Sequence, residues 1–407
     1  MKILFLNAYF YPEKIAFTHL EKDIIETLLK KGYEIKILCP IPTRGITSKV
    51  KDEYRNKKYE KIYNDRVEII RFWAPQEGKN PIIRALRYFW CNLRQYQIGR
   101  KIKDCDFIFS VSTPPTQGML AGKLAKKLKI PHIYSLQDIF PDSLINSKLA
   151  KKNGILWKIG RIIENFTYKN AEKIIVISES MKINIINKGV PKEKIKIISN
   201  WIDIKNVVQI KREENILFKE LKLNIDDFII VYAGNFGAAQ GTDILFEVAK
   251  KLEKHKKLKF VLFGGGAYFE QAKQKAKTIK NIIINDLLPL EYVSQVYSLG
   301  NIALITCKKG TGIAGMPSKT WSIMACNTPI IASFDIKSEL SDILKKSSAG
   351  KCVEAESVEE LSIAILEEYE YYLKNGLRKI NSREFVKQHA SKEVCVERYI
   401  ELFSMIK

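Results

Sequence analysis

The feature of this chain that most constrains its fold is an alternation of short apolar segments with amphipathic ones, which runs through the first half and then starts again. Apolar, β-branched runs predict a first series of strands at 2–10, 34–40, 67–73, 106–112, 132–138 and 173–179. A second series follows at 228–234, 259–265, 281–286, 302–306 and 329–333. Helical periodicity lies between most of them, as at 19–32 and 243–255. Buried strands that alternate with helices are typical of a parallel sheet covered on both faces.

The two series predict two domains, and 407 residues are enough for each to have its own core. Residues 200–215 are polar and without clear period, which favours a linker. We therefore predict an α/β protein with two Rossmann-like, doubly wound domains, 1–203 and 204–383, facing a central cleft. Residues 384–407 are predicted to form terminal helices that pack back toward the N-terminal domain. In such sheets ligands bind beyond the carboxyl ends of the strands.

The charge balance and the cysteines limit the class of protein. The chain has 68 Lys and Arg against 45 Asp and Glu, a formal net charge of +23. Such a field favours polyanionic partners, although an AT-rich coding bias toward Lys, Ile and Asn explains the excess equally well. Seven scattered cysteines without a C-x-x-C pair predict neither disulfides nor a zinc site and favour a reducing compartment. No uncharged apolar stretch approaches the length of a transmembrane helix, and no cleavage site follows the first apolar run.

Three glycine-rich segments each follow a predicted strand of the second series and lead into a helix: YAGNFGAAQGTD, FGGGAYFEQA and GTGIAGMPSKTWSIMACNTPIIAS. Glycines let backbone approach a ligand closely, and helix N-termini offer unpaired amides to phosphate. Each loop alone could be a structural turn, but three at one sheet edge predict an anionic, nucleotide-like ligand. Lys319 stands at a helix start, where a cation is unfavourable unless an anion is present, so we predict that it contacts a diphosphate.

The third segment resembles the nucleotide-sugar loop of glycosyltransferase family 4, in which a Glu-containing loop precedes a helix of the form (L/Y)EAMACGTPVIAS. The order YAGN…QGTDIL, LFGGG and MPSK…MACNTPIIAS follows that family, as does VISESMKINIINKGVPKEKIKIISNWID. QDIFPDS resembles a bacterial subset that builds O-antigen and capsule, including the L-fucosamine transferase type. The resemblance covers essentially the whole chain and implies the GT-B fold.

The resemblance implies retaining transfer of a sugar, such as N-acetyl-L-fucosamine or another N-acetylamino sugar, from a nucleotide diphosphate donor, UDP above others. The acceptor would be a lipid-diphosphate-linked saccharide in surface polysaccharide synthesis, at the cytoplasmic face of the cell membrane, with neither a metal ion nor another cofactor. Asp138 and Lys319 are the expected catalytic residues, and Phe17 and Thr18 the expected acceptor contacts. The expected donor contacts are Gly234, Asn235, Phe236, Gln240, Gly264, Gly265, Leu287, Leu288, Gly315, Met316, Pro317, Ser318 and Ser322.

Simpler roles stay open for several of these residues. Asp138 could cap a helix, although Asp142 could take that place, and Thr18 could cap the first helix. The segment 286–288 could be a plain turn.

The chain also departs from the family pattern. Members carry two glutamates eight positions apart where this chain has Ala314 and Ser322, and Arg and Lys where it has Asn235 and Gln240. Two rival functions follow: a GT-B sugar-nucleotide epimerase, or a catalytically inactive donor-binding scaffold subunit. Nucleic-acid binding is not predicted, because no reader motif accompanies the positive charge.

Residues 80–103 contain six basic and no acidic side chains. In a helix, one face would carry the apolar residues Ile82, Leu86, Phe89, Trp90, Leu93 and Tyr96, with Arg84, Arg87, Arg94 and Lys101 on its flank. Such a helix either covers a core or lies on an anionic membrane surface, and the second interpretation fits a lipid-linked acceptor.

Overall fold

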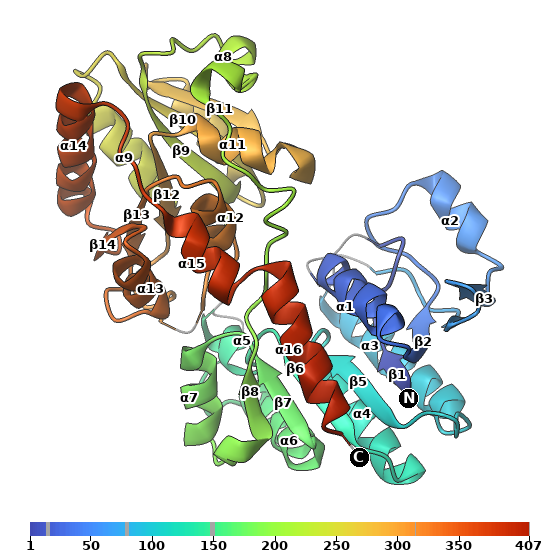
Figure 1. The fold of residues 1–407 in the computed structure, drawn as a ribbon. Coiled ribbons are helices and arrows are strands. Elements are labelled where there is room, and N and C mark those ends of the chain that lie inside the picture. Colours follow the sequence, from blue (N-terminus) through green and yellow to red (C-terminus); the bar gives the residue numbers. More distant parts are fainter. Residues whose placement is uncertain (14–16, 78–80, 147–150, 314, 407) are drawn as a thin grey trace. The chain divides into compact units, whose positions relative to one another are not determined.

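A computed structural model describes residues 1–13, 17–77, 81–146, 151–313 and 315–406. They form two compact units: unit 1, residues 1–199 with the residues from 395 onward, and unit 2, residues 200–394. Each unit is a sheet with helices on both faces (Figure 1). This is the predicted α/β architecture of two Rossmann-like domains.

Unit 1 contains an eight-stranded sheet in the order β3-β4-β2-β1-β5-β6-β7-β8, parallel throughout apart from the pair β3 and β4. Its strands are β1 Lys2–Leu6, β2 Glu34–Pro40, β3 Tyr59–Ile62, β4 Val67–Phe72, β5 Phe107–Val111, β6 His132–Leu136, β7 Lys173–Val176 and β8 Ile195–Ile197. Its helices are α1 Thr18–Lys30, α2 Ser48–Tyr54, α3 Pro81–Gly99, α4 Thr116–Leu128, α5 Asp142–Asn146, α6 Ile155–Asn170 and α7 Glu179–Asn187.

The C-terminal helix α16, Lys392–Ser404, completes the core of unit 1. The rings of Tyr399 and Phe403 lie 6.2 and 5.4 Å from that of Phe109 on β5, and all three side chains are buried. Aromatic burial of this kind dominates the stability of a core, so unit 1 depends on residues from both ends of the chain.

Unit 2 contains a six-stranded, fully parallel sheet in the order β11-β10-β9-β12-β13-β14. Its strands are β9 Phe228–Asn235, β10 Leu258–Gly265, β11 Ile282–Asp286, β12 Ile302–Thr306, β13 Ile330–Phe334 and β14 Gly350–Glu354. Its helices are α8 Leu217–Glu220, α9 Asp243–Lys251, α10 Phe269–Ala276, α11 Val293–Leu299, α12 Lys319–Ala325, α13 Glu339–Ser347, α14 Val358–Asn375 and α15 Ser382–His389. Ile229 and Val231 of β9 enter one core cluster, and Ile230 and Tyr232 the other, as expected of a sheet buried on both faces.

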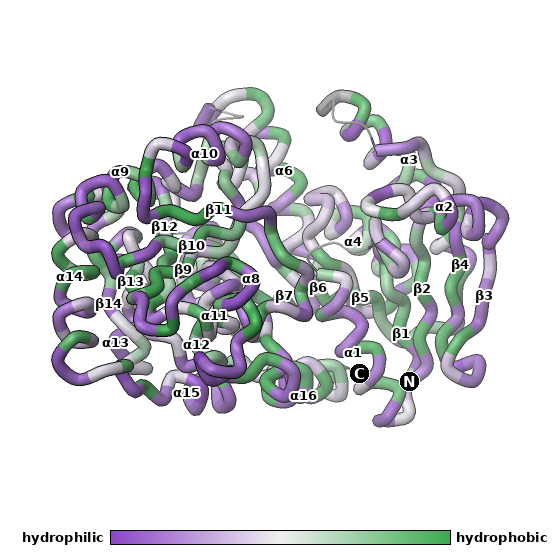
Figure 2. The backbone as a smooth tube through the Cα atoms, turned by 90° about the horizontal axis from the view of Figure 1, so that it is seen from above, coloured by the Kyte–Doolittle hydropathy of each residue, from purple (hydrophilic) through white to green (hydrophobic). Residues whose placement is uncertain are grey.

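All the strands predicted from apolar runs are present, although the predicted strand 2–10 ends at Leu6. The analysis missed β3, β8 and β14, which lie at sheet edges. Their sequences YEKI, IKI and GKCVE are short or partly polar, because an edge strand need not be apolar on both faces. Figure 2 shows this contrast in unit 1, where β3 is largely hydrophilic and the central strands are largely hydrophobic.

Each sheet has one point at which the direction of strand addition reverses. In unit 1 the chain adds β2 on one side of β1 and β5 on the other, so the reversal lies between β1 and β5. In unit 2 it lies between β9 and β12. The crevice beyond the carboxyl ends of the strands at such a point is where doubly wound proteins bind ligands.

Candidate functional site

The loops at the carboxyl edge of unit 2 are hydrogen-bonded to one another. The amide of Phe236 donates to the carbonyl of Gly265 at 2.7 Å, and the amide of Tyr268 donates to the carbonyl of Phe236 at 3.0 Å. The hydroxyl of Thr306, at the end of β12, donates to the carbonyl of Gln240 at 2.7 Å. The glycine-rich loops after β9, β10 and β12 therefore form one continuous surface. The sequence analysis expected these three loops to lie together at one edge of the sheet.

The loop after β12 is held by Asp335, which the sequence analysis did not single out. Its carboxylate accepts the amides of Gly310 and Gly312, each at 2.8 Å. Packing also requires a glycine at position 312, because a Cβ there would stand 2.3 Å from the ring of Phe334. An acidic residue directly after strand β13 was the available signal, since a carboxylate at a strand end often organises the neighbouring loop.

Lys319, the first residue of α12, extends its side chain to the end of β9. Its ammonium lies 2.7 Å from where a Cβ on Gly234 would stand and 4.1 Å from the ring centroid of Tyr232. Lys319 is half-buried; within the described part of the chain no carboxylate lies at ion-pair distance from it, and burial lowers its pKa to about 8. A desolvated cation without a counter-ion at the reversal point of the sheet has the character of an anion site.

The glycines of this edge serve different purposes. Gly234 leaves room for the Lys319 ammonium, whereas a Cβ on Gly264 would stand 2.2 Å from the ring of Phe236. A Cβ on Gly265 or on Gly315 would meet nothing within 4 Å, so open space lies beside the backbone at these two positions.

The expectation that Phe236 contacts the donor fails for its side chain, which is fully buried. Its ring packs against those of Phe269 and Tyr232, at 5.3 and 5.4 Å. The residue therefore serves the core and the loop hydrogen bonds.

The remaining expected donor contacts occupy the same edge. Asn235 is exposed and donates to the side chain of Gln240 at 3.3 Å, so the loop presents neutral amides where the resemblance implies cations. Leu287 is 58% exposed and its amide donates to the carbonyl of Gly264 at 2.8 Å, while Leu288 packs against the core.

Around α12, Met316, Pro317 and Ser322 are partly exposed and Ser318 is exposed. Ser322 lies within α12, close in sequence to Lys319. Ala314 lies outside the described residues.

On unit 1, the predicted residues lie at the carboxyl edge of the sheet. Asp138 follows β6 and is exposed, and the next helix begins at Asp142, so Asp138 does not cap it. The carboxylate of Asp142 accepts from Lys188 at 2.8 Å. Phe17 is the N-cap of α1, so the interpretation of Thr18 as that cap is wrong. Phe17 and Thr18 line a small pocket at the reversal point between β1 and β5.

Helix α3 buries polar side chains and exposes large apolar ones, the opposite of an ordinary surface helix. Its buried positions are occupied by Arg87, Cys91 and Gln95, whereas Leu86 and Phe89 are 64% and 69% exposed. Ile83, Trp90 and Leu93 are exposed as well, and the side chain of Ile82 lies outside the described residues. Tyr96 is half-buried and packs against a core cluster of unit 1. The interpretation in which the whole apolar face covers the core is therefore wrong, since the other described residues of that face are exposed.

Arg87 is anchored inside unit 1 and does not flank the exposed face as predicted. Its Nε donates to the carbonyl of Pro75 and its Nη2 to the hydroxyl of Thr43, both at 2.8 Å. Gln95 donates to the carbonyls of Asn7 and Leu38 at 2.8 and 2.9 Å. These hydrogen bonds satisfy the polar side chains on the buried side of α3, where Cys91 and Ile98 also meet a core cluster.

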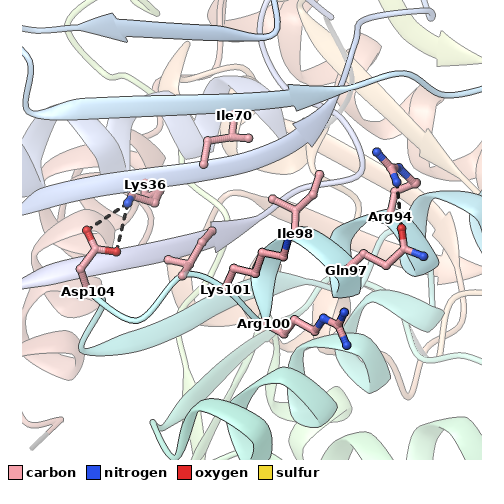
Figure 3. Close-up of a pocket in the computed structure, with 9 residues that line it drawn as sticks. Lys36, Ile70, Arg94, Gln97, Ile98, Arg100, Lys101 and Asp104 are labelled. Carbon is pink, nitrogen blue, oxygen red and sulfur yellow. Dashed lines mark hydrogen bonds and ion pairs between the residues drawn. The ribbon is translucent and has the colours of Figure 1, made fainter.

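A basic hollow of about 610 Å³ lies beside the C-terminal end of α3 (Figure 3). Its cation Lys36, near the start of β2, is matched by Asp104 at 3.0 Å and by Glu68 at 3.1 Å. Arg94 donates to Gln97 at 2.8 Å. The hollow lies toward the amino ends of the strands, away from the reversal point, so its cations do not belong to the candidate site.

Comparison with known proteins gives the same division of the chain. Residues 22–206 match the family model Glycosyltransferase Family 4, and residues 213–380 match the model Glycosyl transferases group 1. No helix within the described ranges is both long and apolar enough to cross a membrane.

The curated relatives have low sequence identity to this chain but match most of its length. The probable glycosyltransferase WbjE of Pseudomonas aeruginosa is 26% identical over 69% of this chain and 70% of its own length. The putative colanic acid biosynthesis glycosyl transferase WcaI of Escherichia coli K12 is 25% identical over 90% of this chain and 91% of its own. Among solved structures, Anabaena HepE in complex with UDP-glucose superimposes with a TM-score of 0.71 at 15% identity, covering 100% of both chains. At that identity the likeness concerns the fold alone.

Proposed function

Because the chain is a glycosyltransferase of the GT-B type, we propose that it transfers a sugar from a nucleotide diphosphate donor, UDP above others, bound at the β9/β12 edge of unit 2. The observation that carries the proposal is Lys319, a desolvated ammonium without a carboxylate partner among the described residues. The fold relative HepE was solved with UDP-glucose, which supports a donor of this class.

In the proposed mechanism, the Lys319 ammonium stabilises the diphosphate as its bond to the sugar breaks. Negative charge develops on this leaving group in the transition state, and a cation already held in place needs no reorganisation to meet it. Asn235 and Gln240 contribute neutral amide groups from the loop after β9. The proposal requires no metal ion, because the lysine and the loop amides supply the charge stabilisation.

The acceptor proposed here is a lipid-diphosphate-linked saccharide of surface polysaccharide synthesis, at the inner face of the cell membrane. WcaI is named for colanic acid biosynthesis, which supports a polysaccharide role. The exposed apolar face of α3, with Arg84 and Arg94 on the same helix, suits a peripheral contact with anionic lipid. Asp138, exposed at the edge of unit 1, is the proposed carboxylate on the acceptor side. The proposed sugar is an N-acetylamino sugar, transferred with retention of configuration.

Calorimetric titration with UDP, GDP, CMP and dTDP tests the donor site. We expect UDP to bind the wild type, Lys319→Ala to bind it at least tenfold more weakly, and Lys257→Ala, an exposed lysine at the opposite edge of the sheet, to bind it normally. Binding that is equal in all three proteins would refute the assigned role of Lys319.

Turnover assays with UDP-N-acetylamino sugars distinguish the remaining functions. UDP release that depends on a polyprenyl diphosphate saccharide supports the transferase. Conversion of the donor without any acceptor would indicate an epimerase. UDP binding without turnover would indicate an inactive scaffold, a function motivated by Ser322 at a position where the resemblance implies a glutamate.

A further inference from the structure

A small pocket lies at the carboxyl edge of unit 1, where the strand order reverses between β1 and β5. It is lined by Leu6, Asn7, Ala8, Tyr9, Phe17, Thr18, Glu21, Val111 and Thr113. Its free volume of about 30 Å³ holds one water-sized group, such as a single hydroxyl. The pocket therefore has the position of a ligand site and the size of one functional group of a ligand.

A carboxyl group stands in the wall of this pocket. Glu21 is 2% exposed and occupies the buried face of α1, where Leu20, Ile24 and Ile25 provide the packing. Packing alone would favour another apolar residue here, because burying a carboxyl group is costly unless it is hydrogen-bonded. The presence of Glu21 at a core-facing position therefore calls for a polar partner.

Within the described residues, only one of the two carboxyl oxygens of Glu21 has a hydrogen-bond partner. The side-chain amide of Asn7 donates to Oε2 of Glu21 at 2.7 Å. Oε1 of Glu21 and Oδ1 of Asn7 are both buried and have no hydrogen-bond partner there. Buried polar atoms are almost always paired in native proteins, so two unpaired atoms in one small pocket indicate that a polar ligand group completes them.

The charge state of Glu21 suits a neutral ligand group. Burial raises the pKa of Glu21 to about 8, so the carboxyl is mostly protonated at neutral pH. Because Asn7 donates to Oε2, the proton is expected on Oε1, which can then donate. Oδ1 of Asn7 can accept. The pair thus offers one donor and one acceptor, the complement of an alcohol hydroxyl.

We propose that Glu21 and Asn7 bind one hydroxyl of the acceptor saccharide, with Oε1–H of Glu21 donating to the hydroxyl oxygen and Oδ1 of Asn7 accepting the hydroxyl proton. This inference rests on the proposed transferase function and adds a specificity-determining pair to it. Phe17 and Thr18, predicted as acceptor contacts, line the same pocket, so the bound saccharide would extend over the start of α1. A saccharide without a hydroxyl at that position would leave both atoms unpaired and bind more weakly.

The test compares Glu21→Leu, which removes both polar atoms, with Glu21→Gln, which keeps one donor and one acceptor in nearly the same shape. Steady-state transfer is measured from a UDP-N-acetylamino sugar to synthetic polyprenyl diphosphate mono- and disaccharides. We expect Glu21→Leu to raise the acceptor KM at least about tenfold, with the donor KM unchanged, and Glu21→Gln to restore the acceptor KM to within about threefold of the wild type. Val111→Ile, which narrows the pocket from β5 without touching the carboxyl, should raise the acceptor KM as well.

The outcomes separate this inference from the function on which it rests. If Glu21→Leu folds, binds UDP normally and keeps the wild-type acceptor KM, the inference is overturned while the transferase stands. A loss of kcat with unchanged KM for both substrates also overturns it, since that pattern indicates a structural role. If Glu21→Leu does not fold, Val111→Ile decides alone. A wild type that binds UDP and transfers to none of the saccharides would contradict the acceptor pocket and leave the donor site in place.

Discussion

Replacement of Lys319 by methionine should make the unliganded protein more stable and abolish donor binding. The pKa of Lys319 falls from 10.5 to about 8 because burial disfavours its charged form. Each pKa unit corresponds to about 1.4 kcal/mol, so the charged lysine costs roughly 3 kcal/mol of folding free energy at neutral pH. Its contact with the ring of Tyr232 returns about 1 kcal/mol. Methionine has a similar length and no charge, which leaves a net gain of about 2 kcal/mol.

Differential scanning calorimetry at pH 7 measures this gain. For a domain of this size, 2 kcal/mol corresponds to a rise in Tm of roughly 4–8 °C. The matched control is Lys257→Met, an exposed lysine in the same unit, which should change Tm by about 1 °C or less. Because UDP would supply the missing counter-charge, the wild type should gain stability on addition of UDP and Lys319→Met should not.

The pH dependence of the unfolding free energy gives a second test of the same reasoning. A lysine whose folded-state pKa lies below its unfolded value binds fewer protons when folded, so wild-type stability should rise between about pH 8 and 10.5. Lys319→Met should lack that contribution. A lower Tm for Lys319→Met at pH 7, or the same pH profile in both proteins, would refute the reasoning that this ammonium is desolvated and has no carboxylate partner.

Three further predictions concern other parts of the molecule. Gly234→Ala places a methyl group 2.7 Å from the Lys319 ammonium, so it should weaken UDP binding about tenfold; in a double-mutant cycle it should add nothing to Lys319→Met, and additive effects would show that the two residues act separately. Glu21→Gln should raise the unfolding free energy at pH 7 by about 3 kcal/mol in urea unfolding, because a carboxyl whose pKa is raised from 4.5 to about 8 costs the wild type stability as the pH rises through that range; a wild-type unfolding free energy that is the same at pH 4.5 and 8 would contradict the burial of this carboxyl. Phe89→Asp on α3 should reduce cosedimentation with anionic vesicles at least fivefold, whereas Ile225→Asp, an exposed apolar residue of unit 2, should not, and equal effects would rule out a specific contact through α3.

The sequence alone was sufficient to predict the two sheets and to single out the sheet edge at which we propose the donor site. A strand buried on both faces is apolar along most of its length, so β5, β9 and β12 can be recognised in the sequence. Glycine-rich segments directly after such strands must lie at their carboxyl edge. Lys319 could be identified because a cation at a helix start is unfavourable without an anion. These inferences depend on a few neighbouring residues, and local sequence contains that information.

Only the tertiary structure decided which residues meet across the fold. Gly234 and Lys319 are far apart in sequence, and their contact depends on β9 and β12 being neighbours in the sheet. Arg87 is buried with acceptors on Pro75 and Thr43, which lie before α3 in the chain, and most of the predicted apolar face of α3 is exposed. The sequence analysis did not single out Glu21, because its burial and its hydrogen bond with Asn7 appear only in the folded chain. The physical reason is the same in each case: whether a charge or polar group is buried, and at what cost, depends on partners that the fold brings from distant parts of the chain.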